Sequence, residues 1–204
     1  MAHKDRPKSR LVAIEGPHGA GKTTLARLVV RSLTRRKMKA VYTKEPFSKE
    51  LEDSIRKFST SSEANPTALA FLIAADRSLH IRRIEQWLRD GAIVVSDRYQ
   101  LSSYVYQRMD GVNPEFIGLL NRQFRQADLT IVLMLPLSLR LMRLKNELRS
   151  RPRSRFLSRT ALRREQCLYS SLTHPASPLL RVFDSSRPID NLLHDALDVI
   201  SSLS

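Results

Sequence analysis

The chain has 204 residues, 42% of them hydrophobic, which suits one domain with a sizeable core. It has no run of about 18 apolar residues that could span a membrane, and its only cysteine, Cys167, excludes an internal disulfide and a cysteine-based metal site. The formal net charge of +15 comes from 26 arginines and 9 lysines against 20 acidic residues, and it leaves three interpretations open: general composition, small phosphate-bearing substrates and, least favoured, nucleic acid.

The N-terminal segment is charged and lacks the apolar stretch of a secretory signal. We therefore expect a cytoplasmic protein, with a flexible arm at residues 1–9 and one domain over residues 10–204. The first strand is predicted at Leu11–Glu15, a short apolar run.

A phosphate-binding P-loop follows this strand, because residues 16–23 read G-x-x-x-x-G-K-T and lead into a helical pattern at 21–36. Glycines let the backbone curl its N–H groups around phosphate oxygens, and the helix N-terminus adds its positive dipole end. We expect Lys22 between the β- and γ-phosphates of ATP and the Thr23 hydroxyl on Mg²⁺. The residues expected to contact the nucleotide are Gly16, Pro17, His18, Gly19, Ala20, Gly21, Lys22, Thr23 and Thr24.

The second strand is predicted at Ala40–Thr43 and runs into Lys44-Glu45-Pro46, so Glu45 lies at the sheet edge where ligands bind. An exposed strand-end pair is the alternative. Helical patterns follow at 49–58 and 65–90. Arg77 interrupts an apolar stretch of the second helix, and a buried arginine needs either an anionic ligand or an internal Asp or Glu as partner.

The third strand, Ala92–Ser96, runs into Asp97-Arg98. A carboxylate that leaves a buried strand beside a P-loop suits Mg²⁺, and the planar fork of Arg98 could clamp a phosphate. A purely structural Asp–Arg pair is the alternative. The helical pattern at 100–125 is broken near residues 111–114, where Asn113-Pro114 is typical of a helix start.

The fourth strand is predicted at Leu129–Leu135, with helices at 136–150 and 159–173, and a fifth strand at Arg181–Asp184 precedes a helix at 188–203. Between the first two of these helices lies the densest cationic stretch, which contains Arg149, Arg151, Arg153 and Arg155. Arginines alternating with Pro and Ser indicate a mobile loop that becomes ordered on an anion. In a P-loop kinase this segment, about 146–158, is the lid; a solvated basic loop or an RNA-binding strip is the alternative. Arg187, after the fifth strand, could stack on a nucleotide base.

Alternating strands and helices predict a three-layer α/β/α sandwich of the P-loop NTPase class. We expect a five-stranded parallel sheet in the order 2-3-1-4-5, flanked by helices.

These motifs occur in the order of the thymidylate kinases, which the chain resembles over nearly its full length. The specific part is the block Asp97-Arg98-Tyr99-x-x-Ser102-Ser103-x-x-Tyr106-Gln107. The resemblance implies phosphoryl transfer from ATP to dTMP with Mg²⁺, in a homodimer. It also implies that Arg77 and Arg98 hold the acceptor phosphate, that Ser103 and Gln107 lie near the thymine edge, and that Tyr106 lies against the sugar. The catalytic set would be Lys22, Asp97, Arg149, Arg151, Arg153 and Arg155, with Thr23 and Asp97 at the metal.

The chain departs from the family pattern at four places. Phe47-Ser48-Lys49 replaces the Gly-Gly-Thr that usually follows Glu-Pro, and Lys44 stands where Arg is common. His18 stands where the family usually has an acid near the acceptor sugar, and Ile73 stands where an aromatic commonly stacks on thymine. Phe71, two residues away on the same helix, is expected to point elsewhere. The expected substrate-binding residues are His18, Glu45, Ile73, Arg77, Arg98, Ser102, Ser103, Tyr106 and Gln107.

Two alternatives stay open: a kinase for another acceptor, such as dUMP or a deoxynucleoside, and a nucleotide-dependent nucleic-acid-binding module. The intact block from Asp97 to Gln107 argues against the second, because a nucleotide switch needs no deoxynucleotide site.

Overall fold

The computed structural model describes residues 9–60, 65–150, 157–171 and 179–203. The elements are β1 (Arg10–Glu15), α1 (Lys22–Arg35), β2 (Ala40–Lys44), α2 (Lys49–Thr60), α3 (Pro66–Arg89), β3 (Ile93–Asp97), α4 (Gln100–Met109), α5 (Pro114–Asn121), β4 (Leu129–Met134), α6 (Leu137–Ser150), α7 (Arg159–Ser170), β5 (Leu180–Asp184) and α8 (Ile189–Ser202).

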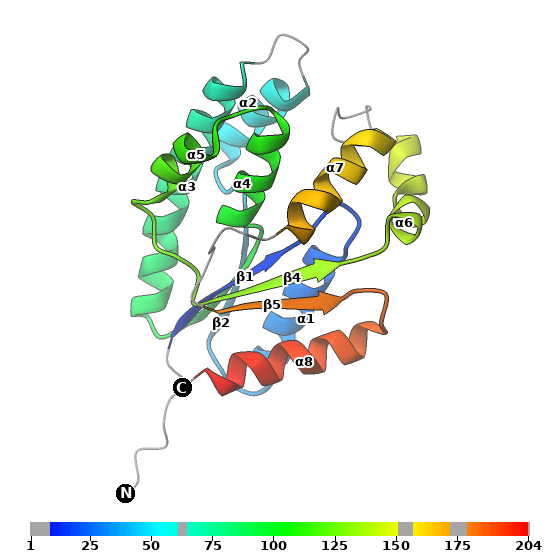
Figure 1. The fold of residues 1–204 in the computed structure, drawn as a ribbon. Helices are drawn as coiled ribbons and strands as arrows, with labels where there is room; N and C mark the ends of the chain where they lie inside the picture. Colours follow the sequence, from blue (N-terminus) through cyan, green and yellow to red (C-terminus); the bar gives the residue numbers. More distant parts are fainter. Residues whose placement is uncertain (1–8, 61–64, 151–156, 172–178, 204) are drawn as a thin grey trace, which may run out of the picture.

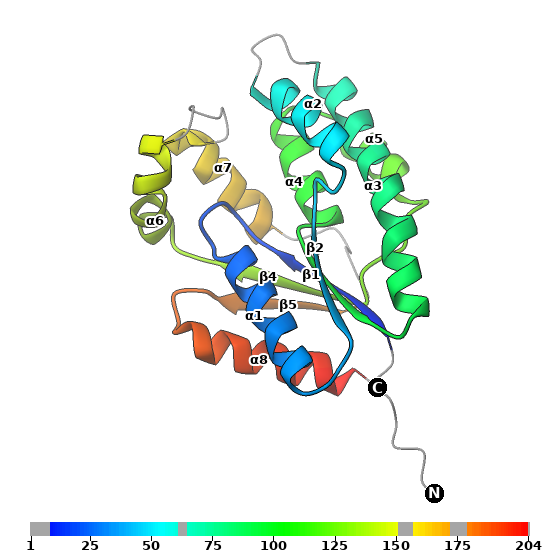
Figure 2. The ribbon, with the colours of Figure 1, turned by 180° about the vertical axis from the view of Figure 1, so that it is seen from behind.

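The five strands form one parallel sheet in the order β2-β3-β1-β4-β5, which confirms the predicted fold class and strand order. Helices cover both faces of this sheet (Figures 1 and 2). Because β1 lies at the centre, the loop after it opens at the carboxyl edge between β3 and β4, where ligands of such sheets bind.

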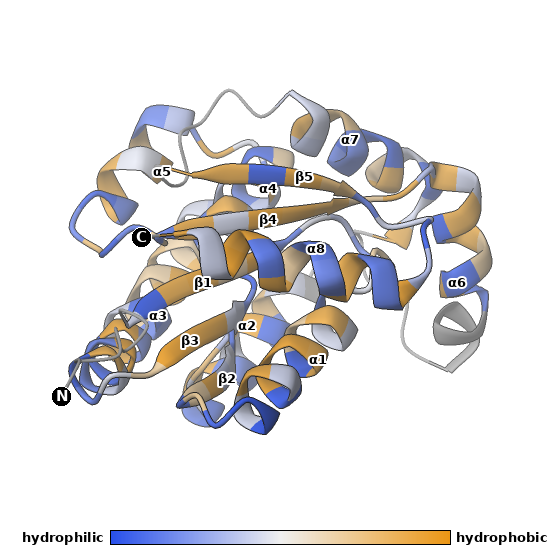
Figure 3. Cartoon of the chain, turned by 90° about the horizontal axis from the view of Figure 1, so that it is seen from below, coloured by the Kyte–Doolittle hydropathy of each residue, from blue (hydrophilic) through white to orange (hydrophobic). Residues whose placement is uncertain are grey.

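Alternate residues of β1 supply the two halves of the core, as expected of a strand covered on both faces. Val12 and Ile14 pack with α1 and α8, and Leu11 and Ala13 pack with α3. A third cluster joins α4 and α7 over Val132 of β4. Figure 3 shows the strands mostly hydrophobic and the flanking helices with mixed faces.

The predicted element boundaries are confirmed to within a few residues. The pattern at 100–125 divides into α4 and α5, and the Asn113 carboxamide accepts a hydrogen bond from the backbone N–H of Glu115 at 2.7 Å at the start of α5. That helix ends at Asn121, earlier than predicted, and Leu135 lies beyond the end of β4.

Most of the predicted arm (residues 1–8) and the centre of the predicted lid (residues 151–156) lie outside the described residues. Within the described ranges, no helix is both long and apolar enough to cross a membrane.

Candidate active site

The P-loop connects β1 to α1 and depends on glycine at two positions. Gly16 has a φ of 134°, and a Cβ there would lie 2.3 Å from the backbone oxygen of Leu133, so the loop lies directly against β4. Gly21 caps α1 in the left-handed conformation with a φ of 95°. This geometry points the N-terminus of α1 toward the loop, where its free N–H groups can bind an anion.

Lys22 is only 6% exposed, and its ammonium donates a hydrogen bond to the backbone oxygen of Pro17 at 2.9 Å. Burial, followed by the positive charge of Arg98, lowers the pKa of Lys22 to about 7. A phosphate group bound in the loop would oppose both effects, because it adds negative charge beside the ammonium.

Thr23 and Asp97 form the oxygen pair expected at a magnesium site. The Thr23 hydroxyl donates to Oδ2 of Asp97 at 2.5 Å, and the Tyr42 hydroxyl donates to the same oxygen at 3.3 Å. In the part of the chain that the structure describes, no group of three or more His, Cys, Asp or Glu side chains could hold a metal ion alone. One carboxylate and one hydroxyl fit Mg²⁺, which takes few protein ligands and completes its shell with water and substrate phosphates.

A cavity of about 250 Å³ opens beside the P-loop, between α2, α3 and α4. Every predicted substrate-binding residue except Arg77 lines it. Ile55, Leu69 and Ile73 supply an apolar wall, whereas His18, Arg98 and Tyr106 supply a polar one. The cavity therefore offers apolar side chains from α2 and α3 that suit a ring, and polar and charged side chains from the P-loop and α4 that suit an anion.

Arg98 lies in the polar wall in a left-handed backbone conformation with a φ of 76°, which is rare for any residue but glycine. Its guanidinium donates to the hydroxyls of Ser102 at 3.2 Å and Tyr106 at 3.1 Å, and it lies 5.1 Å from the centre of the Tyr106 ring. It makes no ion pair with any carboxylate among the described residues. The positive charge of Arg98 thus remains available to a ligand.

Arg77 has the internal acidic partner that the sequence left open. Its side chain is 1% exposed and forms a two-bond ion pair with Glu45. The same guanidinium donates to the Ser103 hydroxyl at 2.7 Å. Arg77 therefore supports the wall through Glu45 and Ser103 and does not line the cavity; its contact with the acceptor phosphate stays a prediction.

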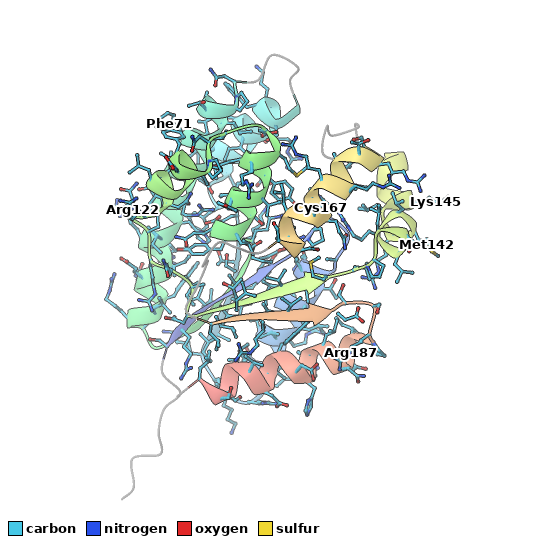
Figure 4. All side chains as sticks on the ribbon, in the orientation of Figure 1. Phe71, Arg122, Met142, Lys145, Cys167 and Arg187 are labelled. Carbon is cyan, nitrogen blue, oxygen red and sulfur yellow. The ribbon has the colours of Figure 1, made fainter. Side chains whose placement is uncertain are left out.

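Two further residues predicted to lie near the base, Ile73 and Gln107, also line the cavity. Ile73 lines it, whereas Phe71 is 54% exposed and its ring contacts Phe116, so Phe71 points away as predicted (Figure 4). The side-chain oxygen of Gln107 is buried in the cavity wall and has no hydrogen-bond partner among the described residues. A buried oxygen of this kind needs a donor, which a bound ligand could supply.

The predicted lid arginines are only partly described. Arg149 lies in the last turn of α6, and Arg151, Arg153 and Arg155 lie outside the described residues. Arg187, the predicted base-stacking residue, forms an ion pair with Asp195 at 2.7 Å on the first turns of α8 (Figure 4). The roles of these arginines stay predictions.

Four residues that the sequence analysis did not assign hold the site together. Glu15 accepts the backbone N–H groups of Tyr99 and Ser102 at the start of α4, and Arg143 donates to the Gly19 and Ser185 backbone oxygens at 3.4 and 3.1 Å. The other two, Arg140 and Glu165, are both fully buried and form an ion pair beneath the P-loop.

A signal for this buried pair existed in the sequence. Glu165 falls on the same helical face as Leu162 and Tyr169, and Arg140 lies among the leucines of α6. Charged residues on apolar helix faces need partners, by the same reasoning that was applied to Arg77.

The parallel sheet, the P-loop and the adjacent cavity fit a P-loop nucleoside monophosphate kinase. The family model for thymidylate kinase matches residues 14–196. The chain is 36% identical to a probable thymidylate kinase of Caldivirga maquilingensis over 93% of this chain and 92% of that protein. It is 33% identical to one of Methanococcus maripaludis over 94% and 95%, and 37% identical to probable thymidylate kinase 1 of Saccharolobus solfataricus over 68% and 71%. The chain therefore belongs to the thymidylate kinase family.

Proposed function

We propose that the protein transfers the γ-phosphoryl group of ATP to dTMP and forms ADP and dTDP. The observation that carries this proposal is Arg98, which lines the acceptor cavity directly after Asp97 and has no carboxylate partner among the described residues. A charged guanidinium without a carboxylate partner suits the two-bond recognition of a phosphate. The choice of dTMP is supported by the relatives, which carry the name of thymidylate kinases.

In this proposal the chain catalyses the reaction by positioning and by charge neutralisation. Lys22 and the free N–H groups at the start of α1 hold the β- and γ-phosphates. Arg98 holds the acceptor phosphate, whose oxygen attacks the γ-phosphorus in line as ADP leaves. No general base is required, because the acceptor phosphate is already an anion near neutral pH.

Thr23 and Asp97 would hold Mg²⁺, which neutralises charge on the ATP phosphates when it is bound. Arg149, Arg151, Arg153 and Arg155 are proposed to cover the transferring group from the lid, and Arg187 to lie beside the adenine. Each of these roles follows from the place of the residue in the chain.

The replacement Lys22→Ala tests the assignment. We expect the rate of ADP release with ATP and dTMP to fall by several orders of magnitude, while far-UV circular dichroism stays that of the folded protein. The replacement Lys145→Ala, at an exposed lysine of α6, is the matched control and should retain full activity (Figure 4). A Lys22→Ala enzyme with near wild-type activity would disprove the proposal.

The second candidate is a kinase of the same class with a different acceptor, such as dUMP or a deoxynucleoside. It is favoured by Ile73, since an aliphatic side chain lines the cavity where the family commonly has an aromatic. A panel of acceptors assayed with ATP separates the two candidates. If the protein phosphorylates another acceptor but not dTMP, the second candidate is correct.

A cytoplasmic homodimer completes the proposal. Large apolar side chains lie exposed on α3 and α5, with exposed fractions of 54% for Phe71, 46% for Leu79 and 58% for Leu119. An exposed apolar surface of this kind is typical of an interface. Light scattering after gel filtration should give twice the mass of the chain, and Leu119→Glu should reduce it to the monomer mass.

A further inference from the structure

A buried carboxylate joins the P-loop, α4 and α6. Glu165 on α7 has a fully buried side chain. Its Oε1 accepts hydrogen bonds from the backbone N–H of His18 at 3.0 Å and from the Tyr106 hydroxyl, and it lies 2.8 Å from Nδ1 of His18. Its Oε2 accepts from Arg140. One side chain thus ties together segments that lie 147 and 59 residues away from it in the chain.

These contacts determine where the His18 ring carries its hydrogen. Although burial raises the pKa of Glu165, the hydrogen bonds from His18 and Tyr106 and the charge of Arg140 lower it below its ordinary value, so near pH 7 Glu165 is a carboxylate and can only accept hydrogen bonds. The Tyr106 hydroxyl, 3.1 Å from Nδ1, uses its one hydrogen on Glu165 and offers only lone pairs to the ring. Both neighbours therefore require a hydrogen on Nδ1.

The opposite ring nitrogen, Nε2, is the one left for a ligand. It makes no hydrogen bond to any described residue, and the His18 side chain is 29% exposed and lines the acceptor cavity. Burial, opposed by the hydrogen bond to Glu165, lowers the pKa of His18. The positive charges that face it, Arg98 and Lys22, act in the same direction as burial. The ring is thus neutral near pH 7, and Nε2 carries a lone pair.

We propose that Glu165 is a positioning residue for the acceptor. It holds His18 as the Nδ1–H tautomer, with Nε2 as the acceptor of a hydrogen bond from an O–H or N–H group of the acceptor nucleotide. It also orients Tyr106, whose hydroxyl accepts a bond from Arg98. This inference rests on the proposed function, since it concerns the same cavity.

A competing interpretation is that Glu165 serves only as the partner of Arg140. A buried ion pair can often be replaced by apolar side chains at little cost, whereas removal of one partner is costly. The two interpretations therefore differ for the double replacement Arg140→Met with Glu165→Leu. A purely structural pair predicts a double variant at least as active as Arg140→Met alone.

The experiment compares the wild type, Arg140→Met and the double variant. Imidazole ¹⁵N chemical shifts assign the His18 tautomer, and steady-state kinetics gives KM for dTMP and for ATP. We expect the Nδ1–H tautomer in the first two proteins and the Nε2–H tautomer, which histidine prefers in water, in the double variant. KM for dTMP should rise about tenfold between Arg140→Met and the double variant, as expected for one lost hydrogen bond, while KM for ATP changes less than twofold.

The same tautomer in all three proteins, or an equal KM for dTMP in the two variants, would overturn the role of Glu165. Absence of dTMP phosphorylation by the wild type would instead overturn the proposed function. In that case the ¹⁵N chemical shifts alone decide whether Glu165 determines the tautomer of the His18 ring.

Discussion

Arg77 and Arg98, the two arginines predicted to hold the acceptor phosphate, should respond in opposite ways to replacement by methionine, which keeps the apolar stem and removes the charge. In Arg77→Met, Glu45 loses its guanidinium partner while its side chain stays buried at 9% exposure. Removal of one partner of a buried ion pair costs about 3–5 kcal/mol. Because His80 can still donate to Glu45 from 3.2 Å, we expect the lower end, about 3 kcal/mol.

In Arg98→Met, by contrast, two hydrogen bonds to neutral hydroxyls, at 3.2 and 3.1 Å, and the contact with the Tyr106 ring disappear, and no carboxylate among the described residues loses an ion-pair partner. At about 0.5–1.5 kcal/mol for each bond, the expected loss of unfolding free energy is about 1–3 kcal/mol. We expect the lower end, because the replacement also removes the desolvation cost of a guanidinium that has no carboxylate partner among the described residues. The loss in activity should be much larger. A hydrogen bond to a charged group contributes about 1.5–3 kcal/mol, so the loss of a two-bond phosphate contact predicts a fall of about 10²–10⁴-fold in kcat/KM for dTMP.

Urea unfolding monitored by Trp87, the single tryptophan, gives the free energies, and a coupled ADP-release assay gives the kinetics. Arg77→Met should be the less stable protein and should retain kcat/KM for dTMP to within about tenfold. A larger loss of stability in Arg98→Met than in Arg77→Met, or a wild-type kcat/KM for dTMP in Arg98→Met, would refute these assignments.

Three further predictions concern the P-loop, the buried pair and the cavity lining predicted to lie near the base. Gly16→Ala places a methyl group 2.3 Å from the Leu133 oxygen, so thermal unfolding should shift down by several degrees and ATP binding should be lost; a wild-type melting curve would contradict this. Glu165 has a folded-state pKa of about 2, below its ordinary value of 4.5, so its contribution to stability is present above pH 4.5 and is lost as the pH falls toward 2. The pKa difference corresponds to about 3 kcal/mol. In Glu165→Gln, the free energy of unfolding should therefore lack this decrease between pH 4.5 and pH 2. Ile73→Phe should lower KM for dTMP about twofold to tenfold by ring stacking, whereas Phe71→Ile, outside the cavity, should not change it.

The sequence was sufficient to predict the positions of functional residues that belong to continuous motifs. The P-loop and the block from Asp97 to Gln107 are continuous, and each follows a strand at the carboxyl edge of one parallel sheet, so the topology alone brings them together. The cavity lining then includes both Ile73 and His18, which the family resemblance assigns to the neighbourhood of the base and of the sugar.

The partners of buried charges could not be predicted in this way. Arg77 and Glu45 lie 32 residues apart, and Arg140 reaches the His18 carbonyl across 122 residues. A periodic pattern shows that such a side chain faces the interior, but it does not show which segment the packing brings to it. For Arg77 this left two partners open, and for Arg140 and Glu165 it left the pair unnoticed.

Glu15 has a consequence for how the enzyme can move. Its carboxylate ends β1, immediately before the P-loop, and accepts the backbone N–H groups of Tyr99 and Ser102 at 2.8 and 2.9 Å. These bonds join the start of the P-loop, proposed to bind the donor, to the start of α4, proposed to contact the acceptor, so we expect the two segments to move together. Structures with and without nucleotides should superpose on β1, the P-loop and α4, and the displacement that brings donor and acceptor into line should be found in the helices packed around them.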